Sequence, residues 1–182
     1  DRLVGEIARY LAEEFKLQNF RPAPLRLTND VTAYDFYLRG NEYLNRETTH
    51  ENIDRAIDSF STALIHDADF SMANVGLCEA YWKRYEITKS VNWLNEAEKL
   101  CIKALNQDDR SVQAYRATAM IYADLGRSQE SLKFLAKGLE IDADDVPLLL
   151  TSAHTHYLLG DDAVAEKIYT DILAKNSNSW KI

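Results

Sequence analysis

A repeat of 34 residues in the second half of the chain constrains its fold more than any other feature. Residues 112–145 align with residues 146–179 without a gap, and the alignment matches Gly126 with Gly160. The same template extends towards the N-terminus if two turns are allowed to lengthen. Self-similarity at a fixed period of this size indicates stacked copies of one small structural unit. We therefore expect four units in the 182-residue chain, at 33–70, 71–111, 112–145 and 146–179.

Each unit has the pattern of two helices. In the second half of the first unit, apolar residues recur at helical spacing: Ile53, Ala56, Ile57, Phe60, Ala63 and Leu64. Gly126 and Gly160 stand where a helix pair must reverse direction, and glycine adopts a left-handed backbone there at little cost. Six glycines and three prolines are too few for the many turns of a β-sandwich or barrel. The sequence therefore predicts an all-α fold.

Polar residues at the expected helix ends fit this pattern. Thr48 and Glu51 have the spacing of a capping box, Ser128 opens the second helix of the third unit, and Pro147 suits a first helical turn. Three acidic pairs fall at expected helix junctions: Asp108-Asp109, Asp144-Asp145 and Asp161-Asp162. Carboxylates at such junctions cap the following helix. We expect caps here rather than catalytic carboxylate pairs.

The charge and hydropathy of the chain exclude several classes of partner. The chain has 21 basic and 29 acidic side chains, a formal net charge of −8, and no basic stripe, so nucleic-acid binding is not expected. No apolar run approaches the length of a spanning helix, so we expect no membrane insertion by this segment. Cys78 and Cys101 lie in apolar helical context, which favours two small core residues over a disulfide or a metal site.

The sequence offers few groups for catalysis. His154 and His156 are two residues apart on an expected helix and point to different sides of it, so they are not expected to hold one metal ion. None of the familiar nucleophile, nucleotide-binding or zinc-protease motifs occurs. We therefore expect no enzymatic activity, no cofactor and no metal in this segment, even if a parent protein carries a separate catalytic domain.

The placement of aromatic and small residues resembles the tetratricopeptide repeat (TPR) family. In the first unit these positions are held by Phe36, Gly40 and Tyr43, then by Ala56, Phe60 and Ala63. Departures from the family pattern are Asn74 for an early aromatic, His156 for a tyrosine and Gly138 for a late alanine, and no unit has the closing proline. The resemblance implies a right-handed superhelix of four helix pairs whose first helices line a concave surface.

The resemblance also implies a partner-binding groove on that concave surface. The side chains expected to bind a partner are Tyr34, Tyr37, Asn41, Glu79, Trp82, Arg116, Met120, His154 and Tyr157. Further expected lining residues are Leu44, Met72, Val75, Gln113, Asp124 and Leu150. Rigid aromatic side chains of this kind are common where protein surfaces bind partners.

The resemblance does not extend to the chaperone-binding subclass of the family. The Lys, Asn and Arg set that clamps chaperone carboxylates has only Asn41 and Arg116 as matches. The first and third units carry net charges of −5 and −2 by count. We expect a protein or peptide segment with apolar or aromatic anchors and some positive charge as the partner.

The ends of the chain differ from the repeats. Residues 1–32 are predicted to form an amphipathic helix and a proline-containing linker, with an apolar stripe of Leu3, Ile7, Tyr10, Leu11 and Phe15. Residues 180–182 begin what resembles another repeat helix, or a cap, at Trp180.

The segment that precedes and runs into the first unit is similar to the segment that precedes the repeats in some bacterial multidomain signalling proteins. These are class III adenylate cyclases, CadC-like membrane-bound transcription regulators and some serine/threonine kinases. The similarity implies a protein-interaction module serving as the scaffold or regulatory part of a larger protein. The alternative function is self-association of the parent as a homo-oligomer. We expect a cytoplasmic location, with the periplasm as the alternative that a CadC-like architecture implies.

Overall fold

The computed structural model describes residues 28–177, and in this part every regular element is a helix. The helices are α2 (Val31–Asn45), α3 (His50–His66), α4 (Ser71–Thr88), α5 (Val91–Gln107), α6 (Val112–Asp124), α7 (Ser128–Ile141), α8 (Val146–Leu158) and α9 (Asp162–Ser177). The predicted all-α class is confirmed. The amphipathic stripe and proline linker expected before residue 28, and the segment at 180–182, lie outside the described residues.

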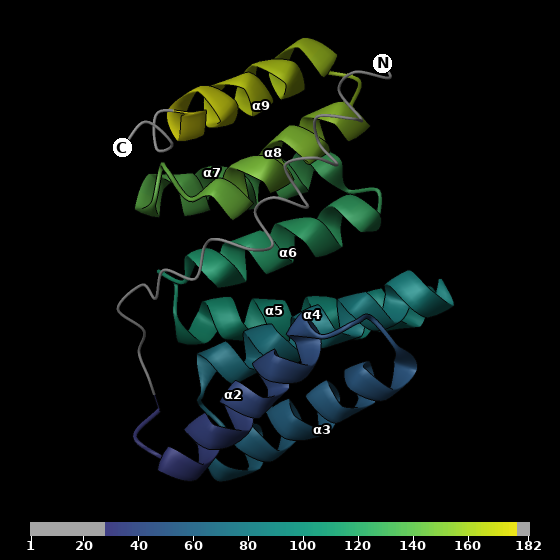
Figure 1. Cartoon of the computed structure of the whole chain (residues 1–182), viewed down its shortest axis with the longest axis vertical. Coiled ribbons are helices and arrows are strands. Elements are labelled where there is room, and N and C mark those ends of the chain that lie inside the picture. Colours follow the sequence, from purple (N-terminus) through teal and green to yellow (C-terminus); the bar gives the residue numbers. More distant parts are fainter. Residues whose placement is uncertain (1–27, 178–182) are drawn as a thin grey trace.

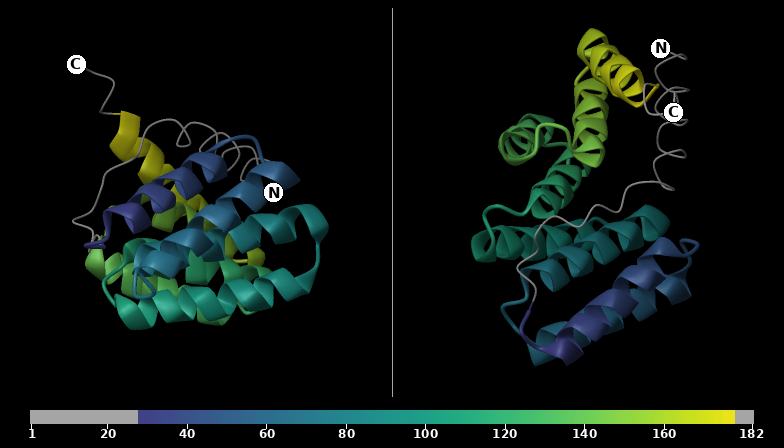
Figure 2. Two further views of the ribbon diagram at one scale, coloured as in Figure 1. Left: turned by 90° about the horizontal axis from the view of Figure 1, so that it is seen from below. Right: turned by 60° about the vertical axis from the view of Figure 1, so that its left-hand side comes forward.

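The helices form four consecutive pairs that stack along the long axis of the molecule. Each first helix packs on the second helix of its own pair, and each second helix packs on the first helix of the next pair. Figure 1 shows the stack running from α2 and α3 at one end to α8 and α9 at the other, and the right-hand view of Figure 2 shows the same order from another side. This arrangement is a helical solenoid, in which each unit buries its apolar face against its neighbours.

Some of the predicted helix caps are confirmed and others are not. Asp145 accepts a hydrogen bond from the backbone N–H of Leu148 at 2.7 Å, and proline occupies the first turn of α8, as expected. The expected capping box at Thr48 is wrong by one residue, because Thr49 is the cap of α3 and accepts from the N–H of Asn52 at 3.2 Å. Ser128 is the first residue of α7, but its neighbour Arg127 stands at the cap position without a side-chain cap hydrogen bond.

The turns within the helix pairs depend on a left-handed backbone conformation that few residue types adopt. Gly126 and Gly160 have φ values of +74° and +80°, as predicted for the tight reversals of the last two units. The extra residues of the second unit do not lengthen its turn. They lengthen the helices, so that α4 has 18 residues and α5 has 17, and Lys89 takes the left-handed position with φ of +54°.

The core of the first two units is built around one aromatic ring. Phe60 of α3 is 0% exposed and lies against Gly40 of α2 and Gly76 of α4. A Cβ atom at Gly40 or Gly76 would stand only 2.5 Å or 2.4 Å from a ring carbon of Phe60. The close approach of the three helices therefore requires glycine at both positions.

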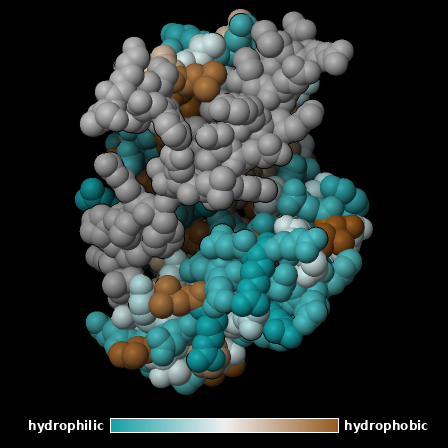
Figure 3. All heavy atoms as spheres, viewed as in Figure 1, coloured by the Kyte–Doolittle hydropathy of each residue, from teal (hydrophilic) through white to brown (hydrophobic). Residues whose placement is uncertain are grey.

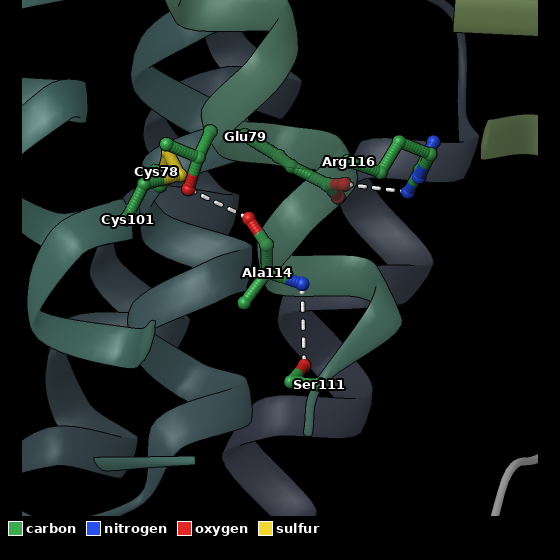
Figure 4. Close-up of a disulfide and its surroundings, with 7 residues drawn as sticks. Cys78, Glu79, Cys101, Ser111, Ala114 and Arg116 are labelled. Atoms are coloured by element: carbon green, nitrogen blue, oxygen red, sulfur yellow. Dashed lines mark hydrogen bonds and ion pairs between the residues drawn. A yellow bond between two sulfur atoms is a disulfide. The ribbon is translucent and has the colours of Figure 1, made fainter. Parts of the chain in front are cut away.

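Cys78 and Cys101 form a disulfide between α4 and α5, so the prediction of two separate thiols is wrong. Their Cα atoms are 5.6 Å apart, and both residues are 0% exposed. Each cysteine takes a small-residue position at the contact of its helix pair, which brings the two side chains within bonding reach. Figure 4 shows the bond beside Ala114 of α6, which belongs to the same buried cluster.

Candidate functional site

The first helices of successive pairs line one side of the stack. Contacts join α2 to α4, α4 to α6 and α6 to α8, whereas within the described chain the second helices α3, α5, α7 and α9 do not contact one another. The first helices are therefore the more closely spaced layer of a curved stack. We call the surface formed by their partly or fully exposed residues the inner face: Tyr34, Asn41, Glu79, Trp82, Arg116, Met120, Asp124, His154 and Tyr157.

The α2 part of the inner face rests on a buried tyrosine. Tyr37 is only 6% exposed, and its ring lies 5.1 Å from that of Phe70 between ring centroids. Tyr34 stacks on it with centroids 6.0 Å apart. Burial raises the pKa of the Tyr37 hydroxyl, while a hydrogen bond with Asn41 acts in the opposite direction. Tyr37 thus supports the surface that Tyr34 and Asn41 present.

An ion pair joins the middle of the inner face across two helices. Arg116 of α6 donates to Glu79 of α4 at 2.7 Å, and the two side chains are 28% and 24% exposed (Figure 4). Asp145 also interacts with Arg116. Burial raises the pKa of the Asp145 carboxyl, and the N–H of Leu148 and the charge of Arg116 partly oppose that rise. The guanidinium of Arg116 therefore pairs with Glu79, and its positive charge also acts on the carboxyl of Asp145.

A second polar contact joins the same helices near their other ends. The indole N–H of Trp82 in α4 donates to a carboxylate oxygen of Asp124 in α6 at 2.5 Å. The Trp82 ring itself is half-buried, so part of its apolar surface stays open to solvent. This contact fixes a large aromatic side chain in one orientation, and fixed aromatic side chains lose little entropy when they bind a partner.

The α8 part of the inner face is the most exposed. His154 is exposed, Tyr157 is 42% exposed, and the adjoining Leu158 is 49% exposed. His156 does not join His154. It faces Asp161 across the turn at 3.2 Å, and within residues 28–177 no group of three or more His, Cys, Asp or Glu side chains is placed to hold a metal ion.

The structure brings most of the predicted site residues together on one surface. Tyr34, Asn41, Glu79, Trp82, Arg116 and Met120 are half-buried, and His154 and Tyr157 are exposed. Tyr37 is different because it is buried, and three of the further lining residues belong to the core: Leu44, Met72 and Val75. Sequence reasoning missed Leu158, although the 34-residue alignment with the exposed Asp124 places it on the same surface.

Two hollows on the described surface are lined by none of the predicted site residues. One, of about 420 Å³, lies between the α6–α7 turn and the end of α8, beside Arg127 and Leu158. The other, of about 470 Å³, lies between α8 and the second half of α9.

None of the helices in the described part is both long and apolar enough to cross a membrane.

Comparisons with known proteins define the class of fold. No protein-family model matches the chain, and no curated protein matches it. Among solved structures, a thermophilic TPR protein of Thermus thermophilus is similar at a TM-score of 0.71 and 16% identity, covering 94% of this chain and 80% of that one. The chain is thus a helical-repeat solenoid, and its fold is that of the tetratricopeptide repeat proteins.

Two further similar structures contain bound peptides. The first TPR of Spaghetti (RPAP3) bound to HSP90 peptide SRMEEVD has a TM-score of 0.61 and 17% identity, covering 73% of this chain and 99% of that one. The second TPR domain of human RPAP3 in complex with HSP70 peptide SGPTIEEVD has a TM-score of 0.55 and 18% identity, covering 68% and 94%.

Proposed function

We propose that this chain is a protein-interaction module that binds a segment of a partner protein on its inner face. The observation that carries this proposal is the alignment of oriented, partly exposed aromatic and charged side chains along four adjacent helices. Trp82, Arg116 and Tyr157 are residue types that contribute most to the binding energy of protein interfaces. The peptide complexes of the similar TPR structures support the same use of the fold.

The charges on the inner face favour a cationic partner with apolar anchors. Arg116 is already paired with Glu79, and the Asn41 side chain is engaged by Tyr37. A free carboxylate on a ligand would therefore meet no unpaired cation at these positions. Basic side chains of a partner would instead find Asp124, whose hydrogen-bond partner Trp82 is uncharged, while its apolar side chains would contact Trp82 and Tyr157.

Selection from a displayed library of random peptides tests this proposal without knowledge of the natural partner. We expect enriched peptides to combine Lys or Arg with aromatic or aliphatic residues. Their affinity should fall about tenfold or more for Trp82→Ala and for Tyr157→Ala, because truncating a central aromatic anchor costs this much at typical interfaces. Lys133→Ala, on the exposed side of α7, is the matched control and should leave affinity unchanged.

Two results would overturn the proposal. One is the failure of any peptide to be enriched on a chain whose helical circular dichroism and cooperative melting show it to be folded. The other is enrichment of peptides whose affinity does not change in either aromatic variant, because such peptides would bind elsewhere.

The buried disulfide supports a location outside the reducing cytoplasm. Disulfides persist in the periplasm and other oxidising compartments and are rare in the cytosol. Of the two compartments expected from the sequence, the periplasm is therefore the one we propose. To test this, the chain is produced in the cytoplasm and, separately, exported to the periplasm of a bacterial host. Alkylation and mass spectrometry then show whether the two cysteines are free or bonded. Thiols that stay free after periplasmic export would contradict the proposal.

We also propose that the module serves a larger bacterial signalling or regulatory protein. The support is the similarity of its N-terminal lead-in to the segments before the repeats of such proteins. The sequence of the complete parent gene product tests this directly, and a parent without a signalling, kinase or transcription-regulatory domain would overturn it.

A further inference from the structure

The hollow of about 420 Å³ beside the α6–α7 turn adjoins the inner face. Its apolar walls lie around the ends of α6 and α8 and are formed by Ala123, Gly126, Leu158 and Leu159. Ala123 precedes Asp124 and Leu158 follows Tyr157, and both of these neighbours belong to the inner face. A volume of this size is within the range of ligand-binding pockets in proteins. The hollow is thus an open site at the edge of the inner face.

One wall of this hollow is an exposed apolar side chain, because Leu158 is 49% exposed. In the view of Figure 3, the apolar residues over α2 and α3 form only small, separate patches in a mostly hydrophilic surface. Single exposed apolar residues of that kind are normal in folded proteins. Leu158 differs from them because it stands at a hollow and next to a second exposed apolar side chain, Tyr157. Apolar surface that is both joined and hollowed is typical of binding sites.

The corresponding corner between the second and third units is filled. One apolar cluster there joins side chains from three helices: Trp82 and Tyr85 of α4, Leu94 of α5 and Leu125 of α6. Leu94 is only 1% exposed, and Trp82 also donates its indole N–H to Asp124. Side chains of the chain itself therefore occupy that corner.

The third unit has small residues at the positions of the two filling side chains of α4. The second and third units begin at residues 71 and 112, so their first helices are related by a shift of 41 residues. By this count Ala123 takes the position of Trp82, and Gly126 takes that of Tyr85. Both replacements remove an aromatic ring from the corner that precedes α8.

The second helix of the third unit changes in the same direction. Ala97 and Ser131 are both 0% exposed and hold the same position of α5 and α7, which are related by a shift of 34 residues. Ser128 therefore takes the position of Leu94. Three bulky side chains of the filled corner thus have small counterparts beside α8, and the hollow is the space that they leave.

The walls of the hollow indicate which kind of side chain would fill it. Leu158 takes the position of Asp124 in the 34-residue repeat, so the hollow lacks the acceptor that holds the indole N–H of Trp82. At the rim, both carboxylate oxygens of Glu130 already accept from Arg127 at 2.7 Å. The side chain of phenylalanine meets these conditions, because its ring buries a large apolar surface and requires no hydrogen bond.

We propose that this hollow is a pocket for a phenylalanine side chain of the partner segment. In this arrangement the ring lies against Ala123, Gly126 and Leu159, and it covers the exposed side chain of Leu158. The ring occupies the space that has no aromatic side chain of its own in the third unit. The inference rests on the proposed binding of a partner segment at the inner face, and it adds one anchoring pocket at the edge of that face.

A small probe tests the pocket without the rest of a partner segment. N-acetyl-phenylalaninamide is titrated into the full chain and followed by two-dimensional amide NMR, with N-acetyl-alaninamide as the comparison. We expect the phenylalanine probe alone to shift the amide signals of residues 123–130 and 158–159. The absence of such shifts at a probe concentration of tens of millimolar would overturn the proposal.

Two variants change the hollow in different ways. Ala123→Trp fills it from within, and Leu158→Asp lines it with a charge. Each should weaken binding of the phenylalanine probe about tenfold or more, because burial of a phenylalanine side chain contributes at least this factor. Leu38→Asp is the matched control, since Leu38 of α2 is 44% exposed, and it should leave binding unchanged.

Leu158→Asp keeps this test decisive even if Ala123→Trp does not fold, because Leu158 is already half exposed. Circular dichroism shows whether each variant is folded. Unchanged affinity of the probe in the folded hollow variants would overturn the proposal.

The peptides selected from the displayed library test whether a partner segment uses the pocket. We expect enriched peptides to contain phenylalanine and to lose about tenfold or more in affinity for Leu158→Asp. Peptides that depend on Trp82 but bind Leu158→Asp and Ala123→Trp with full affinity would overturn this inference and leave the proposed function standing. If no peptide is enriched, the proposed function fails, whereas the probe titration still decides whether the hollow accepts a phenylalanine ring.

Discussion

At the scale of single residues, a few close contacts decide how the helix pairs stack. Phe60 contacts glycines of two neighbouring helices, and Leu148 contacts a glycine of the preceding pair. The repeat pattern of the sequence singled out Gly40, Phe60 and Gly138 as positions of the repeat. It did not show which pairs touch, because contacts between units depend on the angle at which the helices cross.

Gly76→Ala should destabilise the first two units. The added Cβ would lie 2.4 Å from a ring carbon of Phe60, so the ring or helix α4 must shift. We expect a loss of about 1–3 kcal/mol in the free energy of unfolding, measured by urea denaturation. Phe60→Leu in the same chain should recover part of that loss, and an equal loss in both backgrounds would contradict the contact.

The carboxyl of Asp145 should give stability an unusual pH dependence. Burial raises its pKa in the folded state, so the folded chain binds this proton more tightly than the unfolded chain does. The contribution of this carboxyl to the free energy of unfolding is therefore fully present below its ordinary pKa of 3.8. It is lost as the pH rises through the raised pKa of the folded chain. Asp145→Asn keeps a capping side chain but has no proton to lose.

The comparison is made by urea unfolding of the wild-type chain and Asp145→Asn at a series of pH values. The wild-type chain should lose stability relative to the variant as pH rises through this range. A relative gain over the same range would show that Arg116 and the Leu148 N–H outweigh burial.

At the scale of helices, much of the architecture could be predicted because each helix carries its own signals. Gly126 and Gly160 marked two turns, and the apolar spacing of residues 53–64 marked α3. The α4–α5 turn could not be placed correctly, because no glycine marks it and Lys89 adopts the left-handed conformation instead. The disulfide was missed for a similar reason, since helical context alone does not reveal which two cysteines face each other.

Removal of the disulfide should destabilise the second unit without unfolding its helices. The bond closes a loop between residues 23 positions apart, and chain-entropy estimates for such a loop give about 3 kcal/mol. We expect this loss in urea denaturation for the double variant Cys78→Ala, Cys101→Ala, and a similar loss for the wild-type chain unfolded in the presence of reductant. Unchanged stability in both experiments would contradict a structural role for the bond.

Reduction of the folded chain should be slow. Both cysteines are 0% exposed and share a cluster with Ala114 and Ile121 of α6, so a reductant must wait for local opening. Mild denaturant should therefore accelerate reduction strongly, as followed by alkylation and mass spectrometry. A reduction rate that is independent of denaturant would contradict this shielding.

At the scale of the whole molecule, the solenoid places side chains from four helices on one face. Most residues of that face were expected from the resemblance to tetratricopeptide repeats, in which the repeat register assigns each position a side of its helix. The sequence could not separate Tyr37, Leu44, Met72 and Val75 from the exposed residues, since their burial depends on how closely neighbouring pairs pack. The pairings of Arg116 with Glu79 and of Trp82 with Asp124 also join separate units and have no local signal.

The most direct test of the account is a hydrogen-exchange footprint of a selected peptide on the full chain. If the inner face is the binding surface, protection should appear in α4, α6 and α8 around Trp82, Arg116 and Tyr157, and it should disappear in Trp82→Ala. Protection confined to the outer sides of α3, α5 and α7, or no protection at saturating peptide, would contradict the central claim.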